Sequence, residues 1–257
     1  MLLHGWLGSW GIWQQTMATL GESFRTYALD FWGFGESGKK HPEFTVSDFV
    51  SLVDQFMEQL GIAHAPLVGH SMGGTVSLKV AIHHPERVEK IVVIGSPIVG
   101  GSLSPLLRMA GFGPVAFLAY NLPIALRLGI RLFAPLITAA PDEWYNMQER
   151  DLSRTTLESF LFSIASLRQS DLRSRLHEVT IPTLGIFGTG DNILHPEQYK
   201  PLQAGIPHAQ IEIMQNARHF PVLDSTPQFN RLLLDFLEAG DDLETLTLKE
   251  EWKRRMR

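Results

Sequence analysis

The stretch Gly69-His70-Ser71-Met72-Gly73 decides the fold, because a serine with a glycine two positions away on either side forms a tight nucleophile turn. Residues 65–68 are short and apolar, as in a buried strand, and residues 74–82 have the apolar spacing of a helix. Ser71 is thus predicted at a strained strand-to-helix turn, where only glycine neighbours let the backbones approach closely. The helix N-terminus would place backbone N–H groups beside an anion formed there.

The composition is that of an ordinary globular protein, with 257 residues, 44% hydrophobic and 19% charged. This length favours one domain with an insertion over two equal domains. The net charge of −5 comes without a basic stripe, so a nucleic-acid partner is not expected. The lack of cysteine excludes disulfides and a cysteine nucleophile. No signal peptide, no membrane contact and a cytoplasmic location are expected from the start of the chain and its short apolar runs.

Predicted strands alternate with predicted helices along most of the chain, which indicates a mostly parallel sheet with helices on both faces. The predicted helix at 46–60 has Thr45 as its N-cap and ends at Gly61. Six strands are predicted, at 1–3, 26–30, 65–68, 91–94, 183–187 and 210–214, and further helices near 12–20, 74–82 and 226–237.

The segment 100–170 interrupts this alternation, since it is helix-like and apolar and carries no strand signal. We predict a core at 1–99 and 171–240, a helical cap at 100–170 and a charged tail at 241–257. The apolar inner face of the cap either packs on the core as pure structure, or it lines an acyl-binding pocket or opens at a lipid surface. The structural and functional readings are compatible, and a lining role is favoured over membrane contact because small-molecule pockets are mostly apolar.

Two further residues complete a candidate catalytic set with Ser71. A serine hydroxyl needs a histidine to remove its proton and a carboxylate to orient that histidine. Asp191 follows a predicted strand directly, and His219 lies just past the last predicted strand. The chain order serine, aspartate, histidine is the one expected for a nucleophile on such a turn. All three fall at strand C-terminal ends, where open α/β sheets bind ligands.

Each partner of Ser71 has an alternative. Asp191 is alternatively the N-cap of a helix that begins near Pro196. His195 is the second candidate for the base, because it is close to Asp191 in sequence. Asp224 is expected to cap the following helix. No spacing typical of metal ligands occurs, so neither a metal nor a cofactor is expected.

These motifs give the chain a resemblance to an α/β-hydrolase of the esterase and lipase-like group, whose cap is inserted after the sixth family strand. The resemblance covers residues 1 to about 238 and rests on His4-Gly5-Trp6, the loop 30–37, 69–74, 188–191 and His219. It implies that the backbone N–H groups of Trp6 and Met72 form an oxyanion hole and that both side chains wall the acyl pocket. It also implies that the site is supported from behind by His4, Gly5, Gly69, His70 and Gly73.

The family usually has two strands before the His-Gly loop, whereas this sequence begins three residues ahead of it. We therefore expect the N-terminal strands to be missing and the His-Gly loop to follow a short edge strand. Such a strand would hold the loop less firmly than a strand with neighbours on both sides.

The resemblance and the candidate set together predict a serine hydrolase that cleaves carboxylic esters with an apolar acyl group through an acyl-enzyme, without a cofactor. The expected partner is a small-molecule ester. The alternatives are a carbon–carbon bond hydrolase or a perhydrolase of the same fold, or a weakly catalytic ligand-binding protein. Enzymes of this fold with an aspartate nucleophile are disfavoured, because position 71 is a serine.

Overall fold

Six parallel strands form one sheet in the computed structural model, in the order β2-β1-β3-β4-β5-β6. The structure describes residues 1–40, 43–110, 112, 114 and 122–240, so the predicted tail at 241–257 and part of the predicted cap lie outside it. The strands are β1 (Leu2–Leu3), β2 (Ala28–Leu29), β3 (Ala65–His70), β4 (Val88–Ile94), β5 (Thr183–Gly188) and β6 (Gln210–Met214). The mostly parallel sheet predicted from the sequence is confirmed.

The strand β1 is short, as predicted, but the prediction that it is an edge strand is wrong. Leu2 pairs with Ala28 on one side and with Val68 on the other, so β1 lies inside the sheet and β2 forms the edge. Both neighbours therefore hold the end of β1, where the loop that begins at His4 leaves the sheet.

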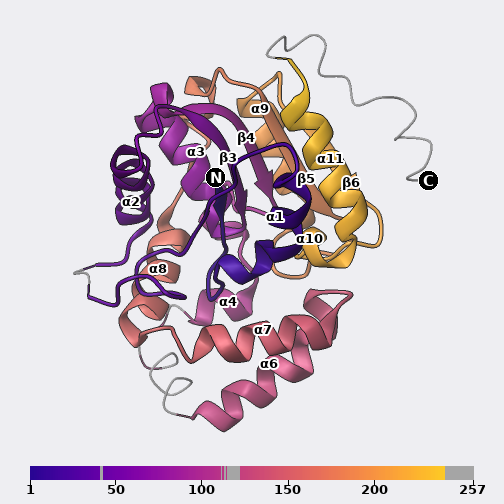
Figure 1. Cartoon of the computed structure of the whole chain (residues 1–257). Coiled ribbons are helices and arrows are strands. Elements are labelled where there is room, and N and C mark those ends of the chain that lie inside the picture. Colours follow the sequence, from indigo (N-terminus) through magenta and orange to yellow (C-terminus); the bar gives the residue numbers. More distant parts are fainter. Residues whose placement is uncertain (41–42, 111, 113, 115–121, 241–257) are drawn as a thin grey trace.

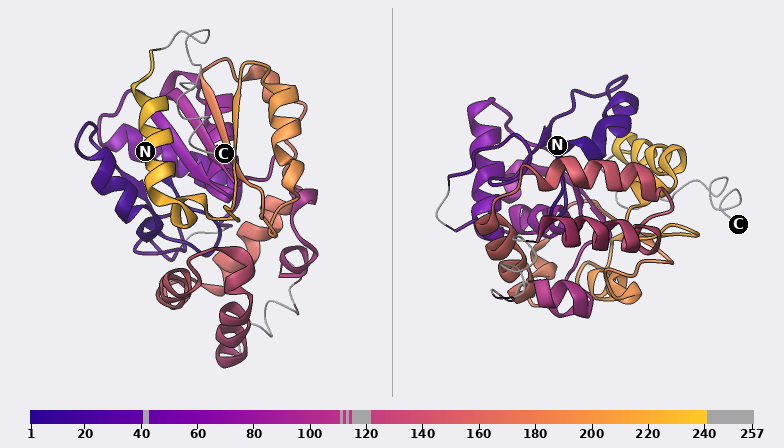
Figure 2. Two further views of the ribbon diagram at one scale, coloured as in Figure 1. Left: turned by 90° about the vertical axis from the view of Figure 1, so that its right-hand side faces the viewer. Right: turned by 90° about the horizontal axis from the view of Figure 1, so that it is seen from below.

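Helices cover both faces of the sheet, and alternation along the strands divides the core in two. Ile91 and Val93 pack with residues of α2 (Val46–Gln59), α3 (Met72–His83) and α9 (Tyr199–Gly205), whereas Val92 and Ile94 pack with residues of α1 (Gln14–Leu20) and α11 (Thr226–Glu238). Figure 2 shows α9 and α11 on opposite sides of the sheet. The two-sided burial explains why these strands read as continuous apolar runs.

Local signals set the ends of α2 as the sequence predicts. The Thr45 side chain accepts a hydrogen bond from the Asp48 N–H, and the Asp48 side chain accepts one from the Thr45 N–H, which makes a capping box. Gly61, just past the helix, has a φ of +65°, a conformation that glycine adopts without strain.

The insert, defined here as residues 100–170, contributes α4 (Pro105–Ala110), α6 (Pro123–Ile137), α7 (Pro141–Leu152) and α8 (Leu157–Gln169). Figure 1 shows α6 and α7 at one end of the sheet, and the left view of Figure 2 shows the same arrangement. Within the described part of the chain, no helix is both long and apolar enough to cross a membrane. The remaining elements are the short helix α10 (Pro221–Asp224) and five 3-10 turns, of which Trp10–Trp13 (η1) precedes α1.

Candidate active site

Ser71 occupies the turn between β3 and α3 with φ +51° and ψ −118°, a strained backbone for a residue with a side chain. Its N–H donates a hydrogen bond of 2.8 Å to the Ile94 carbonyl of the neighbouring strand, and the residue is 7% exposed. The turn is therefore held by the sheet and presents the hydroxyl at the C-terminal edge of the strands, as the pentapeptide predicts.

Close backbone contacts explain the glycines that flank Ser71. A Cβ on Gly69 would lie 2.3 Å from the Gly73 carbonyl group, and a Cβ on Gly73 would lie 2.3 Å from the Leu3 carbonyl oxygen. No side chain fits at such distances, so both positions require glycine. The second contact also ties the turn to the end of β1.

Asp191 and His219 form a buried pair beside this turn. The His219 Nδ1–H donates a 2.9 Å hydrogen bond to Asp191 Oδ2, and both side chains are almost fully buried. The other carboxylate oxygen accepts the N–H groups of Ile193 and Leu194. Burial opposes the charge most strongly, but His219 and these N–H groups outweigh it, so the pKa of Asp191 lies below its ordinary value. The proton on Nδ1 leaves His219 Nε2 as an acceptor.

The structure agrees neither with Asp191 as a helix N-cap nor with His195 as the partner of Asp191. The N-cap of the turn that begins at Pro196 is His195, whose Nδ1 accepts the Glu197 N–H. His195 is exposed, and Asp191 is paired with His219 instead. Within the described residues, no three His, Asp or Glu side chains are grouped to hold a metal ion.

The loop that carries His219 is fixed to the insert, and we call this set of contacts the clamp. The His219 N–H donates to the Ile137 carbonyl at 3.0 Å, and the Arg218 guanidinium donates to the Thr138 carbonyl at 2.6 Å. Asp224 accepts the Arg218 N–H at 2.6 Å and also the Thr138 hydroxyl. The prediction that Asp224 caps α11 is therefore wrong, since Ser225 is the N-cap and Asp224 connects this loop to the end of α6.

His70 supports His219 from behind. The His70 Nε2–H donates 2.9 Å to the His219 carbonyl, because a carbonyl can only accept, and this leaves His70 Nδ1 as an acceptor. Burial, with a smaller effect of the neighbouring His219, lowers the pKa of His70 to about 3. The ring is therefore neutral at ordinary pH and holds one tautomer.

The loop after β1 approaches the nucleophile turn closely, since a Cβ on Gly5 would lie 3.0 Å from the Ser71 Cβ. Gly8 N–H donates to the Gly5 carbonyl across a turn in which Leu7 has a φ of +59°, so the turn's own hydrogen bond does not use the Trp6 N–H. His4 holds the loop with both ring nitrogens, donating 2.7 Å to the Gly5 carbonyl and accepting the Phe31 N–H at 3.0 Å. Burial lowers the pKa of His4, so this bonding pattern is kept.

A cavity of about 340 Å³ joins the candidate residues, since Ser71 and His219 both line it. Fourteen of its twenty lining residues come from the insert, so the insert does more than cover the core. The described lining residues include no acidic side chain, lysine or arginine. Most of the lining side chains are apolar, for example Phe133 of α6 and Phe160 of α8. Such walls favour binding of an uncharged, apolar part of a ligand.

The two predicted oxyanion residues differ in what their side chains do. Trp6 lines the cavity, and its indole N–H donates to the Phe160 carbonyl at 3.1 Å. Met72 instead packs fully buried in the core on the α2 and α3 side of the sheet, so the prediction that its side chain walls the pocket is wrong. As the first residue of α3, Met72 still has an N–H without an acceptor inside the helix.

A much smaller cavity, of about 10 Å³, lies behind the loop and is called the loop cavity here. Three buried polar atoms without a hydrogen-bond partner in the described structure belong to residues that line it, namely His70 Nδ1, Trp144 Nε1 and Asp151 Oδ2. The other Asp151 oxygen accepts the Ser9 hydroxyl at 2.8 Å, which joins α7 to the segment after the loop.

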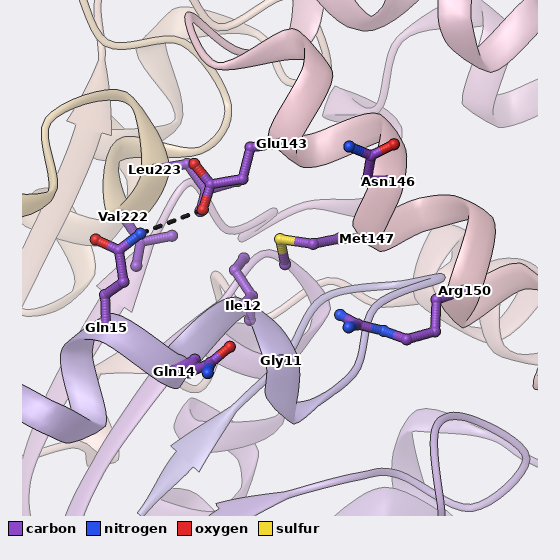
Figure 3. A pocket seen from close by; sticks show the side chains of 10 residues that line it. All are labelled: Gly11, Ile12, Gln14, Gln15, Glu143, Asn146, Met147, Arg150, Val222 and Leu223. Carbon is purple, nitrogen blue, oxygen red and sulfur yellow. Dashed lines mark hydrogen bonds between the residues drawn. The ribbon is translucent and has the colours of Figure 1, made fainter.

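A third cavity, of about 250 Å³, lies on the other side of α7 and contains none of the predicted site residues. Figure 3 shows its polar lining, in which the Gln15 amide donates 3.2 Å to Glu143 and Asn146 points from α7. It is therefore separate from the cavity that Ser71 and His219 share.

Comparison with known proteins agrees with this architecture, because residues 1–226 match the family model described as alpha/beta hydrolase fold. The chain belongs to the α/β-hydrolase fold family. The structure of this α/β hydrolase is similar to that of an esterase from Exiguobacterium antarcticum, with a TM-score of 0.80 over 93% of this chain and 91% of that one, at 19% identity. At this identity, the likeness shows the fold alone.

Two relatives of this α/β hydrolase carry names that describe different reactions. A pimeloyl-[acyl-carrier protein] methyl ester esterase of Vibrio atlanticus is 27% identical and matches 93% of both chains. A 2-hydroxy-6-oxo-6-phenylhexa-2,4-dienoate hydrolase of Burkholderia cepacia is 31% identical over 77% of this chain and 75% of its own length. Hydrolysis is common to both names.

Sequence reasoning missed the supporting residues of the insert. Gln148, Asp151 and Trp144 belong to α7 and line the cavities around the predicted site. Their spacing of three and four positions indicates one helical face, but nothing in that spacing shows which element the face meets.

Proposed function

We propose that this α/β hydrolase is a serine hydrolase that cleaves neutral carboxylic esters with an apolar acyl group. The observation that carries the proposal is the shared cavity, in which the Ser71 turn and the buried His219–Asp191 pair meet uncharged, mostly apolar walls. In the proposed active unit, residues 1–99 and 171–240 supply the reacting groups, and the insert supplies most of the binding surface.

The proposed reaction begins when His219 Nε2 takes the Ser71 hydroxyl proton and Ser71 Oγ attacks the ester carbonyl. Asp191 keeps His219 in the required tautomer and stabilises the imidazolium that forms. The N–H groups of Trp6 and Met72 stabilise the tetrahedral oxyanion, at about 3 kcal/mol for each donor. His219 then returns the proton to the leaving alcohol. A water molecule attacks the acyl-enzyme in the same way and releases the acid and free Ser71.

Carbon–carbon bond hydrolysis is the second candidate, because the Burkholderia cepacia relative is 31% identical. That relative's name ends in dienoate, which describes a substrate with a carboxylate. A buried carboxylate needs a cationic partner, and within the described part of the chain no lysine or arginine lines the shared cavity. This feature favours a neutral ester over such an anion.

The test is hydrolysis of p-nitrophenyl esters from acetate to palmitate by the wild type and by Ser71→Ala, with circular dichroism as the folding control. Turnover by the wild type, an optimum at an apolar acyl group and loss of turnover in the variant would support the proposal. Equal turnover by folded Ser71→Ala would refute it. A folded wild type that cleaves no ester would favour carbon–carbon cleavage, perhydrolysis or a binding role instead.

A further inference from the structure

Gln148 has a buried polar side chain that has no hydrogen-bond partner among the described residues. It lies on α7, is 7% exposed, and makes no hydrogen bond to any described residue. Its amide atoms are not among the polar atoms that are sealed from water. Gln148 lines the cavity that Ser71 and His219 share, and it also lines the much smaller loop cavity.

Each of the other polar side chains in the described lining has a proposed role, has a partner or is sealed from water. Ser71 and His219 perform the proposed chemistry, and the Trp6 indole N–H is bonded to the Phe160 carbonyl. The Trp144 N–H is sealed from water. Among the described lining residues, Gln148 is therefore the polar side chain that remains available to a ligand.

The amide of Gln148 restricts what that ligand can be. It offers one carbonyl acceptor and two N–H donors, which match a ketone, an ether, a hydroxyl or an ester oxygen. A carboxylate or an ammonium group is disfavoured, because none of the described residues that line the cavity carries an acidic side chain, a lysine or an arginine to pair with it. An entirely apolar substrate would cover the amide and leave it without a hydrogen bond, which is unfavourable.

We propose that Gln148 binds a second, neutral oxygen of the substrate, apart from the scissile ester, so that oxygenated esters are preferred over plain alkyl esters. This inference rests on the proposed esterase function and makes Gln148 a specificity-determining residue. Sites built to bond a polar group discriminate against analogues that lack it, because the site's own polar atom is then left unpaired.

The experiment uses pairs of esters that differ by one oxygen at nearly constant size. Methyl heptanoate is compared with methyl heptanoates that carry a ketone at carbon 4, 5 or 6, and butyl hexanoate is compared with 2-methoxyethyl hexanoate. kcat/KM is measured for the wild type, Gln148→Leu and Gln148→Met. Asn146→Leu is the matched control, because Asn146 lies on the same helix but lines the third cavity (Figure 3).

The best oxygenated ester is expected to exceed its oxygen-free partner roughly tenfold in the wild type and in Asn146→Leu. In both Gln148 variants the ratio is expected to fall to near one, while hydrolysis of the oxygen-free ester persists. The inference is overturned if no pair differs by more than about twofold in the wild type, or if the ratio survives in Gln148→Leu.

A binding measurement separates failure of this inference from failure of the proposed function. The same ester pairs are titrated calorimetrically into Ser71→Ala and into Ser71→Ala/Gln148→Leu. A preference for the oxygenated ester that Gln148→Leu removes would support the subsite even if no ester were hydrolysed. Hydrolysis of all esters without any such preference would refute the subsite and leave the esterase function standing.

Discussion

Lowering the pH from 8 to 5 is expected to destabilise this protein through His70, and His70→Gln should remove that part of the loss. The glutamine amide can replace the Nε2–H that donates to the His219 carbonyl, but it cannot take up a proton. His4, whose pKa is also lowered by burial, is present in both proteins, so its contribution cancels from the comparison.

The magnitude follows from the two protonation states of His70. Its pKa is lowered from the ordinary 6.5 to about 3 in the folded protein. Between these values the unfolded chain binds the proton and the folded chain does not, so stability falls as the pH falls. Each pH unit in this window costs about 1.4 kcal/mol. At pH 5 the loss from this group is therefore about 2 kcal/mol, and above pH 6.5 it vanishes.

Urea unfolding of both proteins at pH 8, 6.5 and 5 measures the effect. The wild type should lose about 2 kcal/mol more than His70→Gln between pH 8 and pH 5. In thermal unfolding, the extra loss corresponds to roughly 4–8 °C for a chain of this size. Parallel pH profiles for the two proteins would refute a neutral, buried His70. An effect confined to pH values above 6.5 would contradict the sign of the argument.

Three further outcomes are expected. Asp191→Asn should lower kcat about 10³- to 10⁴-fold with the fold intact, because an amide N–H facing His219 enforces the wrong tautomer; near wild-type kcat would contradict this. Gly69→Ala should cost more than about 3 kcal/mol in urea unfolding, since its Cβ meets backbone at 2.3 Å. Its control is Gly38→Ala, where an added Cβ would meet nothing within 4 Å, so this substitution should change stability by less than about 0.5 kcal/mol. A high-resolution crystal structure should show one water in the loop cavity, bonded to its three unpaired polar atoms; no density there would be the contrary result.

The features that the sequence predicts well are those with a short-range cause. The glycines around Ser71, the cap at Thr45 and the strand-to-helix alternation all act within a few residues, and the structure has each of them. Asp191 and His219 were predictable because chain order and strand ends limit the choices. Their catalytic roles, and the oxyanion roles of Trp6 and Met72, stay predictions.

What the sequence does not predict depends on contacts between distant segments. Aspartate is a common N-cap residue, which is why the sequence predicts that role for Asp224. In the structure its carboxylate instead accepts a hydrogen bond from the distant Thr138 hydroxyl. The short β1 has neighbours on both sides, and the sequence does not predict this because the pairing partners 26 and 66 residues away leave no local signal. In the sequence, Gln148 is an ordinary polar residue of a predicted helix, and only the position of α7 in the fold shows that it lines the cavity.

The clamp limits how freely the insert can be exchanged between related enzymes. The loop of His219 donates hydrogen bonds to the Ile137 and Thr138 carbonyls at the end of α6. Earlier turns of the same helix line the shared cavity. A chimaera that replaces residues 100–170 as a module would therefore change the support of the base together with the binding surface. Grafts that keep 137–139 and vary the earlier turns of α6 would separate the two, and directed evolution of acyl preference is best confined to those turns.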